Sequence, residues 1–302
     1  MRTMYFVGVS TSSSSIMKIF PKWAAELGLK DAEIKGIDLP LHAPQEQYRK
    51  VVGQIKNDPQ AMGALVTSHK IDLFKASQDM FDYIDPYAKT LGEVSSLSKS
   101  EGAFCAHAKD PISSGLALES FVPDNFWSKH GGEVLLLGAG GSALAMSLYF
   151  AQDRHGNNTP TKITIANRST PRLESAKVHL AGIRINAEYH HSPEPHINDT
   201  LISNLPPHSL IVNATGLGKD APGSPTTNAV DYPKNCLVWE INYRGNLIFM
   251  QQAKAQQTKK NLLIEDGWQY FIHGWTQVIS QVFQIPIKNK LLTKLSNLAL
   301  TD

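Results

Sequence analysis

The sequence predicts an α/β protein made of two α/β domains. Short apolar runs, each the length of a buried strand, alternate with segments of helical spacing in both halves of the chain. A glycine-rich turn at residues 138–141 follows one of these runs and opens a helix. The chain has 302 residues, more than one hydrophobic core comfortably supports, so a division into two domains is expected.

The first part of the chain alternates strand and helix up to roughly residue 110, which predicts a parallel sheet. The helix expected at 16–27 carries its apolar residues on one face and stops at Gly28. The strands expected here are 5–9, 33–39 and 63–67, and the helices are 16–27, 45–56 and 71–81.

A second unit begins near Gly115. Two segments of it, 155–160 and 219–228, are polar and rich in Gly, Pro and Asn, which is typical of loops. The strands expected in this unit are 133–137, 162–168, 210–215 and 237–241, and the helices are 143–152 and an aromatic-rich segment at 266–283.

The composition is that of an ordinary globular protein. The chain is 42% hydrophobic and 19% charged, and its net charge of +2 is too mild to favour nucleic acid or a membrane surface. No apolar run reaches the ~20 residues that span a bilayer, and residues 1–8 look like a strand rather than a targeting segment. Cys105 and Cys236 read as free thiols, so a cytoplasmic location is expected. No metal-ligand spacing occurs, so no metal is expected.

The glycine-rich turn predicts a nucleotide site. Gly138, Ala139, Gly140 and Gly141 precede Ser142 and a helix, and Ala143 completes a GxGxxA pattern. Such a turn brings backbone N–H groups and a helix N-terminus to a pyrophosphate. The alternative is a tight strand–helix turn without a ligand.

The following strand favours NADP over NAD. An NAD site has Asp or Glu at the end of this strand to accept from the ribose 2′-hydroxyl. Here the strand ends in Asn167, Arg168 and Ser169, with Arg172 close by, and a guanidinium suits a 2′-phosphate. The alternative is that Arg168 is a solvated residue at a strand end.

The order of these pieces resembles the shikimate dehydrogenase family over nearly the whole chain. Residues 134–141 resemble the family's cofactor loop, 167–169 its NRT element, 212–218 its VNATPLG stretch with Gly216 in place of proline, and 240–243 its D-x-x-Y segment. The resemblance implies a substrate and catalytic domain at 1–114, a Rossmann NADP domain at 115–261 and a C-terminal helical segment at 262–302 that returns to the first domain. The cofactor-binding residues it implies are Gly138, Ala139, Gly140, Gly141, Ser142, Asn167, Arg168, Ser169, Arg172, Asn213, Ala214, Thr215, Gly216 and Leu217.

The resemblance also implies a catalytic pair, Lys70 and Asp110. Residues 65–70 are similar to the family's NVTIPHK, apparently one residue shorter, and Asp110 followed by Gly115 resembles its NTD-x-x-G. A Lys–Asp pair suits hydride transfer, because one group accepts the alcohol proton while the carboxylate positions the ammonium. The alternatives are a solvated turn lysine at 70 and a helix N-cap at 110.

The departures from the family fall on substrate recognition. Of the two serines that hold the substrate carboxylate, the first aligns with Ser14, or with Ser13 or Ser15 if the register slips, and the second with Ile16. Leu65 and Ser95 stand where the family has asparagines, and Gly274 where it has a glutamine. Trp268, Tyr270 and Trp275 either add apolar surface near the substrate or belong to the core, and His69 is expected to be structural. The substrate-binding residues implied are Ser14, Thr67, Ser95, Tyr243 and Gly274.

Each lost donor weakens discrimination for a polyhydroxy acid, so a substrate other than shikimate is expected. The leading hypothesis is an NADP-dependent oxidoreductase of shikimate dehydrogenase type that acts on a cyclic hydroxy acid or a related alcohol or ketone, as a monomer or homodimer. The alternatives are a catalytically idle NADP-binding sensor on the same fold, and a shikimate or quinate dehydrogenase with a rebuilt pocket.

Overall fold

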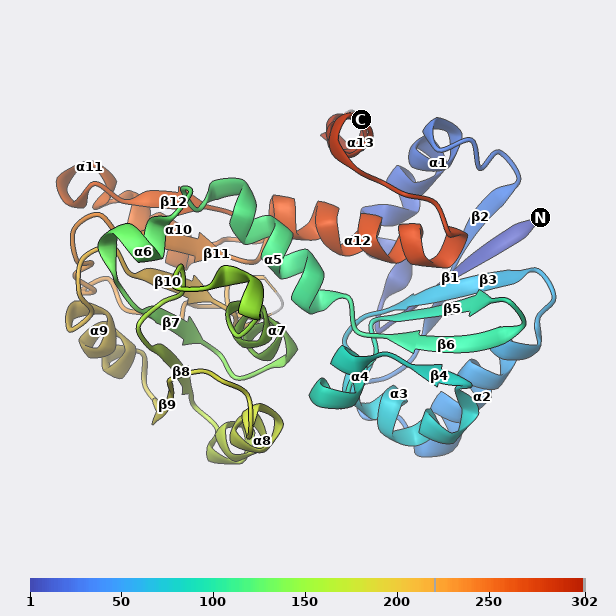
Figure 1. Ribbon diagram of the computed structural model, residues 1–302, viewed down its shortest axis with the longest axis horizontal. Helices are drawn as coiled ribbons and strands as arrows, with labels where there is room; N and C mark the ends of the chain where they lie inside the picture. Colours follow the sequence, from blue (N-terminus) through green and yellow to red (C-terminus); the bar gives the residue numbers. More distant parts are fainter. Residues whose placement is uncertain (220, 301–302) are drawn as a thin grey trace. The chain divides into compact units, whose positions relative to one another are not determined.

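The computed structural model describes residues 1–219 and 221–300. The chain divides into two compact units: unit 1 comprises residues 1–109 and the segment from 274 onward, and unit 2 comprises residues 110–273. Each unit contains a six-stranded sheet with helices, so the prediction of two α/β domains is confirmed (Figure 1). Asp220 of the predicted loop at 219–228 and residues 301–302 of the predicted C-terminal segment lie outside the described residues.

Unit 1 has the strand order β2-β1-β3-β5-β6-β4. Its strands are β1 (Arg2–Gly8), β2 (Ala32–Asp38), β3 (Ala61–Val66), β4 (Tyr83–Ile84), β5 (Ser96–Ser100) and β6 (Ala103–His107). Its helices are α1 (Ile16–Glu26), α2 (Gln45–Asn57), α3 (Lys70–Ser77), α4 (Pro86–Leu91) and α13 (Asn289–Leu300), with short 3-10 turns at Thr11–Ser13 and Gln78–Met80.

The prediction of a parallel sheet in this unit was wrong for one part. β1 pairs in parallel with β2 and β3, but β5 runs antiparallel to both β3 and β6. The reason is a two-residue turn between β5 and β6, in which Glu101 and Gly102 have φ angles of 50° and 82°. Two positive φ values match the twist of a tight hairpin, which can join only antiparallel strands.

Unit 2 has the strand order β12-β11-β10-β7-β8-β9, and every pair is parallel. Counted from its first strand, this is the 3-2-1-4-5-6 order of a dinucleotide-binding fold. Its strands are β7 (Val134–Leu137), β8 (Ile163–Asn167), β9 (Ala187–His191), β10 (Leu210–Asn213), β11 (Leu237–Glu240) and β12 (Leu263–Glu265). Its helices are α5 (Asp110–Phe121), α6 (Phe126–His130), α7 (Gly141–Phe150), α8 (Thr170–Leu180), α9 (Pro195–Ser203), α10 (Ile248–Lys254) and α11 (Gln257–Lys260), with a 3-10 turn at Asp153–His155.

Helix α12 (Trp268–Phe283) is continuous, and its residues 268–273 group with unit 2 while the rest groups with unit 1. No helix in the described part of the chain is long and apolar enough to cross a membrane.

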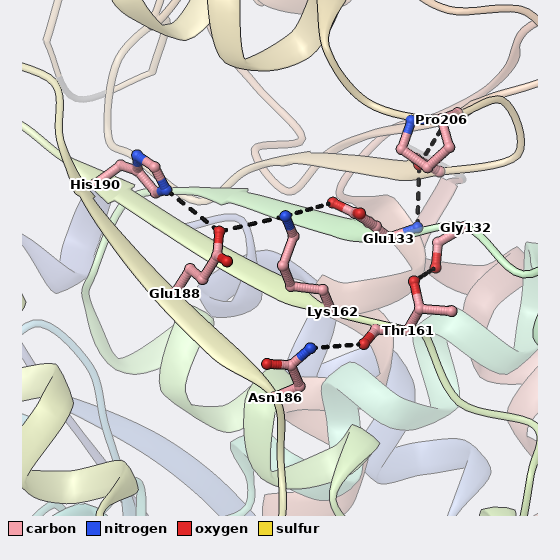
Figure 2. A network of polar contacts seen from close by, with 9 residues as sticks. Gly132, Glu133, Thr161, Lys162, Asn186, Glu188, His190 and Pro206 are labelled. Carbon is pink, nitrogen blue, oxygen red and sulfur yellow. Dashed lines mark hydrogen bonds and ion pairs between the residues drawn. The ribbon is translucent and has the colours of Figure 1, made fainter.

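A polar network fixes the strands of unit 2 at the edge where they begin (Figure 2). Lys162 Nζ lies 3.3 Å from carboxylate oxygens of both Glu133, next to β7, and Glu188 on β9. Asn186 donates to the Thr161 carbonyl at 3.0 Å, and Thr161 donates to the Gly132 carbonyl at 2.9 Å. These contacts tie three neighbouring strands together at the edge opposite their carboxyl ends.

A buried indole fixes the C-terminal helix of unit 1. Trp23 on α1 is fully buried, and its Nε1 donates to the Leu295 carbonyl of α13 at 2.8 Å. Leu295 is also fully buried, so water cannot replace the indole as the hydrogen-bond partner of this carbonyl.

Replacing Trp23 with Phe is therefore expected to lower the free energy of unfolding by about 1–3 kcal/mol, from the lost hydrogen bond and the smaller ring. Denaturant unfolding followed by circular dichroism measures this change. Leu41→Ala is the control, because Leu41 is 59% exposed and its loss should be nearly neutral. Equal effects of the two changes would contradict the role given to Trp23.

Candidate active site

Unit 2 contains a cleft of about 390 Å³ at the carboxyl ends of β7, β8 and β10. In an open parallel sheet, ligands bind at this edge, beside the point where the strand order reverses. The structure brings ten of the predicted cofactor residues to the cleft lining: Gly138, Ala139, Gly140, Asn167, Arg168, Arg172, Ala214, Thr215, Gly216 and Leu217.

The glycine turn shapes the floor of the cleft. Gly138 has φ +120°, and a Cβ at this position would lie 2.6 Å from the Ala214 carbonyl oxygen. Gly140 caps the N-terminus of α7 in an extended conformation, and a Cβ there would meet nothing within 4 Å. Backbone N–H groups without a helical partner therefore stand at the cleft, which is the arrangement that binds anions.

The cationic side of the cleft follows β8. Arg168 and Arg172 are both exposed, and among the described residues neither guanidinium forms an ion pair with a carboxylate. Asn167, at the end of β8, donates from Nδ2 to the Ser169 carbonyl at 3.3 Å. None of the described lining residues carries a carboxylate.

The other predicted cofactor residues are close in sequence to the lining residues but do not line the cleft themselves. Gly141 and Ser142 form the first turn of α7, where Ser142 Oγ lies 3.3 Å from the Tyr270 hydroxyl, and Ser169 precedes α8. Asn213 is fully buried at the end of β10, and its Oδ1 accepts from the Thr215 backbone N–H at 3.1 Å and from Thr215 Oγ1 at 2.6 Å.

Sequence reasoning missed the part of the lining that follows β9. The residues concerned are Ser192, Pro193, Pro195 and Asn198, together with Ala221 and Pro225 from a later loop. β9 has a polar, half-exposed sequence and no apolar run, so the strand itself was not expected. Recognising the Ser-Pro-Glu-Pro sequence as a strand-to-helix turn would have located this wall.

The known proteins that this chain resembles in sequence include shikimate dehydrogenases. No family model matches the chain. A shikimate dehydrogenase (NADP(+)) of Bacillus cereus strain AH820 is 31% identical over 129 residues, which cover 41% of this chain and 42% of that protein. The chain thus matches less than half the length of this relative. A shikimate dehydrogenase (NADP(+)) of Nitrosopumilus maritimus strain SCM1 is 26% identical over 230 residues, 76% of each chain.

Solved structures share the fold over almost the full length. Shikimate 5-dehydrogenase from Listeria monocytogenes, in complex with shikimate and NAD, has a TM-score of 0.73 at 16% identity and covers 98% of this chain and 95% of its own. Quinate dehydrogenase from Corynebacterium glutamicum, in complex with NAD, has a TM-score of 0.74 at 17% identity, with 99% and 98% covered. The chain is thus similar in sequence to shikimate dehydrogenases and shares the fold of solved shikimate and quinate dehydrogenase structures.

The predicted lysine begins a helix of unit 1. Lys70 is half-buried at the first position of α3, directly after a turn in which Ser68 has φ 54°. His69 is fully buried, and its Nδ1 lies 3.1 Å from the Tyr48 hydroxyl, which fits the structural role expected for it. Lys70 thus follows a turn that the buried contact between His69 and Tyr48 holds in place.

The predicted carboxylate begins the first helix of unit 2. Asp110 is 7% exposed at the first position of α5, and its backbone carbonyl accepts from the Ser114 hydroxyl at 2.7 Å. The residue before it, Lys109, belongs to unit 1 and donates from Nζ to Gln281 Oε1 at 2.6 Å. Burial lowers the pKa of the Lys109 ammonium, a feature that sequence reasoning missed.

The predicted substrate positions of unit 1 lie at strand ends and in the serine turn. Thr67 follows β3 and donates its backbone N–H to the Val7 carbonyl at 3.0 Å. Ser95 is 3% exposed and its Oγ already accepts from the Lys109 backbone N–H at 2.8 Å. Ser14 and Ser15 are half-buried before α1, whereas Ser13 is exposed and donates to the Ser10 carbonyl at 2.9 Å.

Three of the positions that depart from the family are apolar or empty. Ile16 is fully buried in α1, and Leu65 is 9% exposed on β3, so neither side chain offers a polar atom. At Gly274 a Cβ would meet nothing within 4 Å, so space replaces a side chain there. Tyr243 packs its ring against Phe271 at 4.5 Å.

All three predicted aromatics take up structural contacts. Trp268 stacks on Phe271 with ring centroids 5.3 Å apart within unit 2. Trp275 is 6% exposed and packs edge-on against Phe6 at 4.9 Å within unit 1. Tyr270 packs against Trp239 at 5.7 Å within unit 2.

The two turn glycines should respond differently to the same small change. Gly138→Ala is expected to destabilise unit 2 by about 1–3 kcal/mol, because the methyl group meets the Ala214 carbonyl and the φ angle is positive. Gly140→Ala is the matched control and should leave the melting temperature nearly unchanged, because its φ is −94° and the added Cβ points into open space. Thermal unfolding measures both, and a Gly140→Ala protein as unstable as Gly138→Ala would contradict this geometry.

Proposed function

We propose that the protein is an NADP-dependent oxidoreductase that transfers a hydride between NADP(H) and a cyclic hydroxy acid or a related alcohol or ketone. The observation that carries this proposal is the cleft of unit 2. It combines a glycine turn at a helix N-terminus with two arginines and no lining carboxylate among the described residues.

In this proposal the pyrophosphate binds at the glycine turn and the 2′-phosphate binds between Arg168 and Arg172. The guanidinium groups lie on the surface of the cleft, where they can make forked, charge-assisted bonds to a phosphate. The wall that follows Asn213 would take the nicotinamide end. The curated relatives are named as NADP(+) enzymes, which supports this choice, whereas the Listeria and Corynebacterium structures contain NAD.

Lys70 and Asp110 would carry the proton chemistry. NADP⁺, when bound, accepts the hydride from the carbinol carbon of the substrate. As the hydride leaves, the Lys70 amine accepts the hydroxyl proton, and in the reverse direction its ammonium returns the proton to the carbonyl oxygen. The carboxylate of Asp110 would orient the ammonium. Both residues begin helices, which fixes their backbones near strand ends.

The substrate is proposed to be something other than shikimate itself. Ile16, Leu65 and Gly274 contribute no hydrogen-bond donor at positions where the family has polar side chains, and Ser95 offers a single hydroxyl, whose oxygen already accepts from a backbone N–H, where the family has an asparagine amide. A pocket with fewer donors discriminates poorly in favour of a compound with several hydroxyl groups. A more apolar cyclic alcohol or ketone acid fits these positions better.

Two alternative functions are each favoured by one observation. The loss of donors also suits a catalytically idle NADP-binding sensor. The likeness to a quinate dehydrogenase suits a shikimate or quinate dehydrogenase with a rebuilt pocket. NADPH absorbance with shikimate, quinate and a panel of cyclic hydroxy acids and ketones separates the three. Turnover with shikimate as the best substrate would overturn the proposed change of substrate.

Replacing Lys70 with Met should lower kcat by about 10²–10⁴-fold on any substrate that the panel identifies, because the proton acceptor is lost. Binding of NADP should be unchanged, which fluorescence titration measures. Lys75→Met is the control, since Lys75 is exposed on the same helix. If the protein binds NADP but a broad screen finds no turnover that depends on Lys70, the proposed catalytic function is wrong and the NADP-binding sensor is favoured.

Replacing Arg168 with Ala should weaken NADP by about 10–100-fold while NAD changes little, because only NADP presents a 2′-phosphate. Arg184→Ala serves as the control, since Arg184 is exposed on unit 2 and lies outside the cleft lining. Calorimetric titration with NADP and with NAD measures how far the substitution weakens the binding of each dinucleotide. An equal loss for NAD and NADP would show that Arg168 does not select the cofactor.

A further inference from the structure

A buried carboxylate lies behind the cleft wall. Glu240 is the last residue of β11 and is fully buried, next to Asn213 at the end of the neighbouring β10. Its Oε2 accepts from Asn213 Nδ2 at 2.7 Å. Its Oε1 accepts from the Asn242 backbone N–H at 3.0 Å and from Asn242 Nδ2 at 2.6 Å. These three partners of the carboxylate are all donors, so they match its ionised form.

The Asn213 amide transmits this contact to the cleft. Its Nδ2 faces Glu240, and this leaves Oδ1 to accept from the backbone N–H and the hydroxyl of Thr215. The Thr215 hydroxyl oxygen in turn accepts from the Leu217 backbone N–H at 3.2 Å. From the other side, Asn242 Nδ2 donates to the Thr215 carbonyl at 3.1 Å. Thr215 and Leu217 line the cleft, so an unbroken chain of hydrogen bonds joins the carboxylate to its wall.

Protonation of the carboxylate would break this chain at its first bond. A protonated Glu240 has a donor where Asn213 and Asn242 also present donors, so at least one of these N–H groups loses its bond to the carboxylate. An Asn213 amide that turned to recover a partner would withdraw its oxygen from Thr215. A buried amide left without a partner costs free energy, so the wall has two arrangements that depend on one proton.

The surroundings place this ionisation in an accessible pH range. Burial raises the pKa of Glu240 to about 7, against the opposing effects of the Asn213 and Asn242 hydrogen bonds and of the charge of Lys219. The Tyr232 phenol also senses this charge, since Glu240 contributes to the raised pKa of Tyr232 after burial itself. Glu265, on the adjacent β12, has a pKa raised by burial and by Asp266. On β10 the facing side chain, Asn213, does not titrate.

We propose that Glu240 is a positioning residue of the cleft: its ionised carboxylate fixes the Asn213 amide and the Thr215–Leu217 wall, so that the ionised protein binds the dinucleotide more tightly. This inference rests on the proposed function, because it takes the cleft to be the NADP site. It adds that pH changes the affinity for the cofactor through a residue that does not itself line the cleft.

The direct test compares NADP affinity at about pH 6 and about pH 8 in the unmodified protein and in Glu240→Gln. Because the carboxylate is mostly protonated at the lower pH, the dissociation constant of the unmodified protein should rise by about three- to tenfold more than that of the variant. Any other ionisation, including that of the 2′-phosphate, is common to both proteins and cancels in this comparison. At the higher pH the variant should bind like the protonated form of the unmodified protein.

Glu265→Gln is the matched control, since it removes a carboxylate from the same sheet without touching the wall. It should keep the pH dependence of the unmodified protein. The melting temperature of Glu240→Gln at about pH 8 should be equal or higher, because ionising a buried carboxylate opposes folding between its unfolded and folded pKa values. Weaker binding without lower stability separates positioning from a general structural role. Identical pH profiles for the unmodified protein and Glu240→Gln would overturn the proposal.

A second measurement needs no variant. Hydrogen exchange of the Thr215 and Leu217 amides, corrected for the intrinsic rate, should lose protection at about pH 6, whereas the Val212 amide inside β10 should not. Unchanged protection of the first two amides would also overturn the proposal. If the unmodified protein binds no NADP at either pH, the proposed function fails, and the exchange result alone decides the role of Glu240.

Discussion

The cleft of unit 2 depends on a close approach of two backbones where β7 and β10 leave the sheet. The Ala214 backbone N–H donates to the Leu137 carbonyl at 2.8 Å, and the Ala214 carbonyl lies where any Cβ on Gly138 would have to be. Because the turn is held this tightly, α7 begins directly at the cleft and its free N–H groups face the space between the strands. The anion-binding character of the cleft thus follows from a steric constraint, and the neighbouring arginines add to it.

The two units differ in how closely their residues match the motifs of the family that the sequence resembles. In unit 2 the glycine turn, the arginines and the wall after β10 surround one cleft. In unit 1 the lysine and threonine positions are retained, but neighbouring recognition positions hold Ile16, Leu65 and the empty space at Gly274. Matching cofactor motifs in one unit, together with substituted recognition positions in the other, are the pattern expected if the reaction type persists and the substrate differs, as proposed above.

Much of this arrangement could be predicted from sequence, because apolar runs and turn residues act locally. The strands 133–137, 162–168, 210–215 and 237–241 contain β7, β8, β10 and β11, and the helix at 266–283 contains α12. The hairpin of β5 and β6 was missed because serines and a lysine interrupt its apolar pattern, and β9 because its face is polar. The link from Glu240 through Asn213 to Thr215 joins residues far apart in sequence, and only the pairing of β10 with β11 brings them together.

The measurement that tests the central claim most directly is equilibrium titration of the unmodified protein with 2′,5′-ADP and with 5′-AMP, each in competition with NADP. The two fragments differ at the 2′-phosphate that Arg168 and Arg172 are proposed to hold. The account predicts that 2′,5′-ADP binds at least about tenfold more tightly and that NADP displaces it. Equal affinity for the two fragments, or no displacement by NADP, would contradict it.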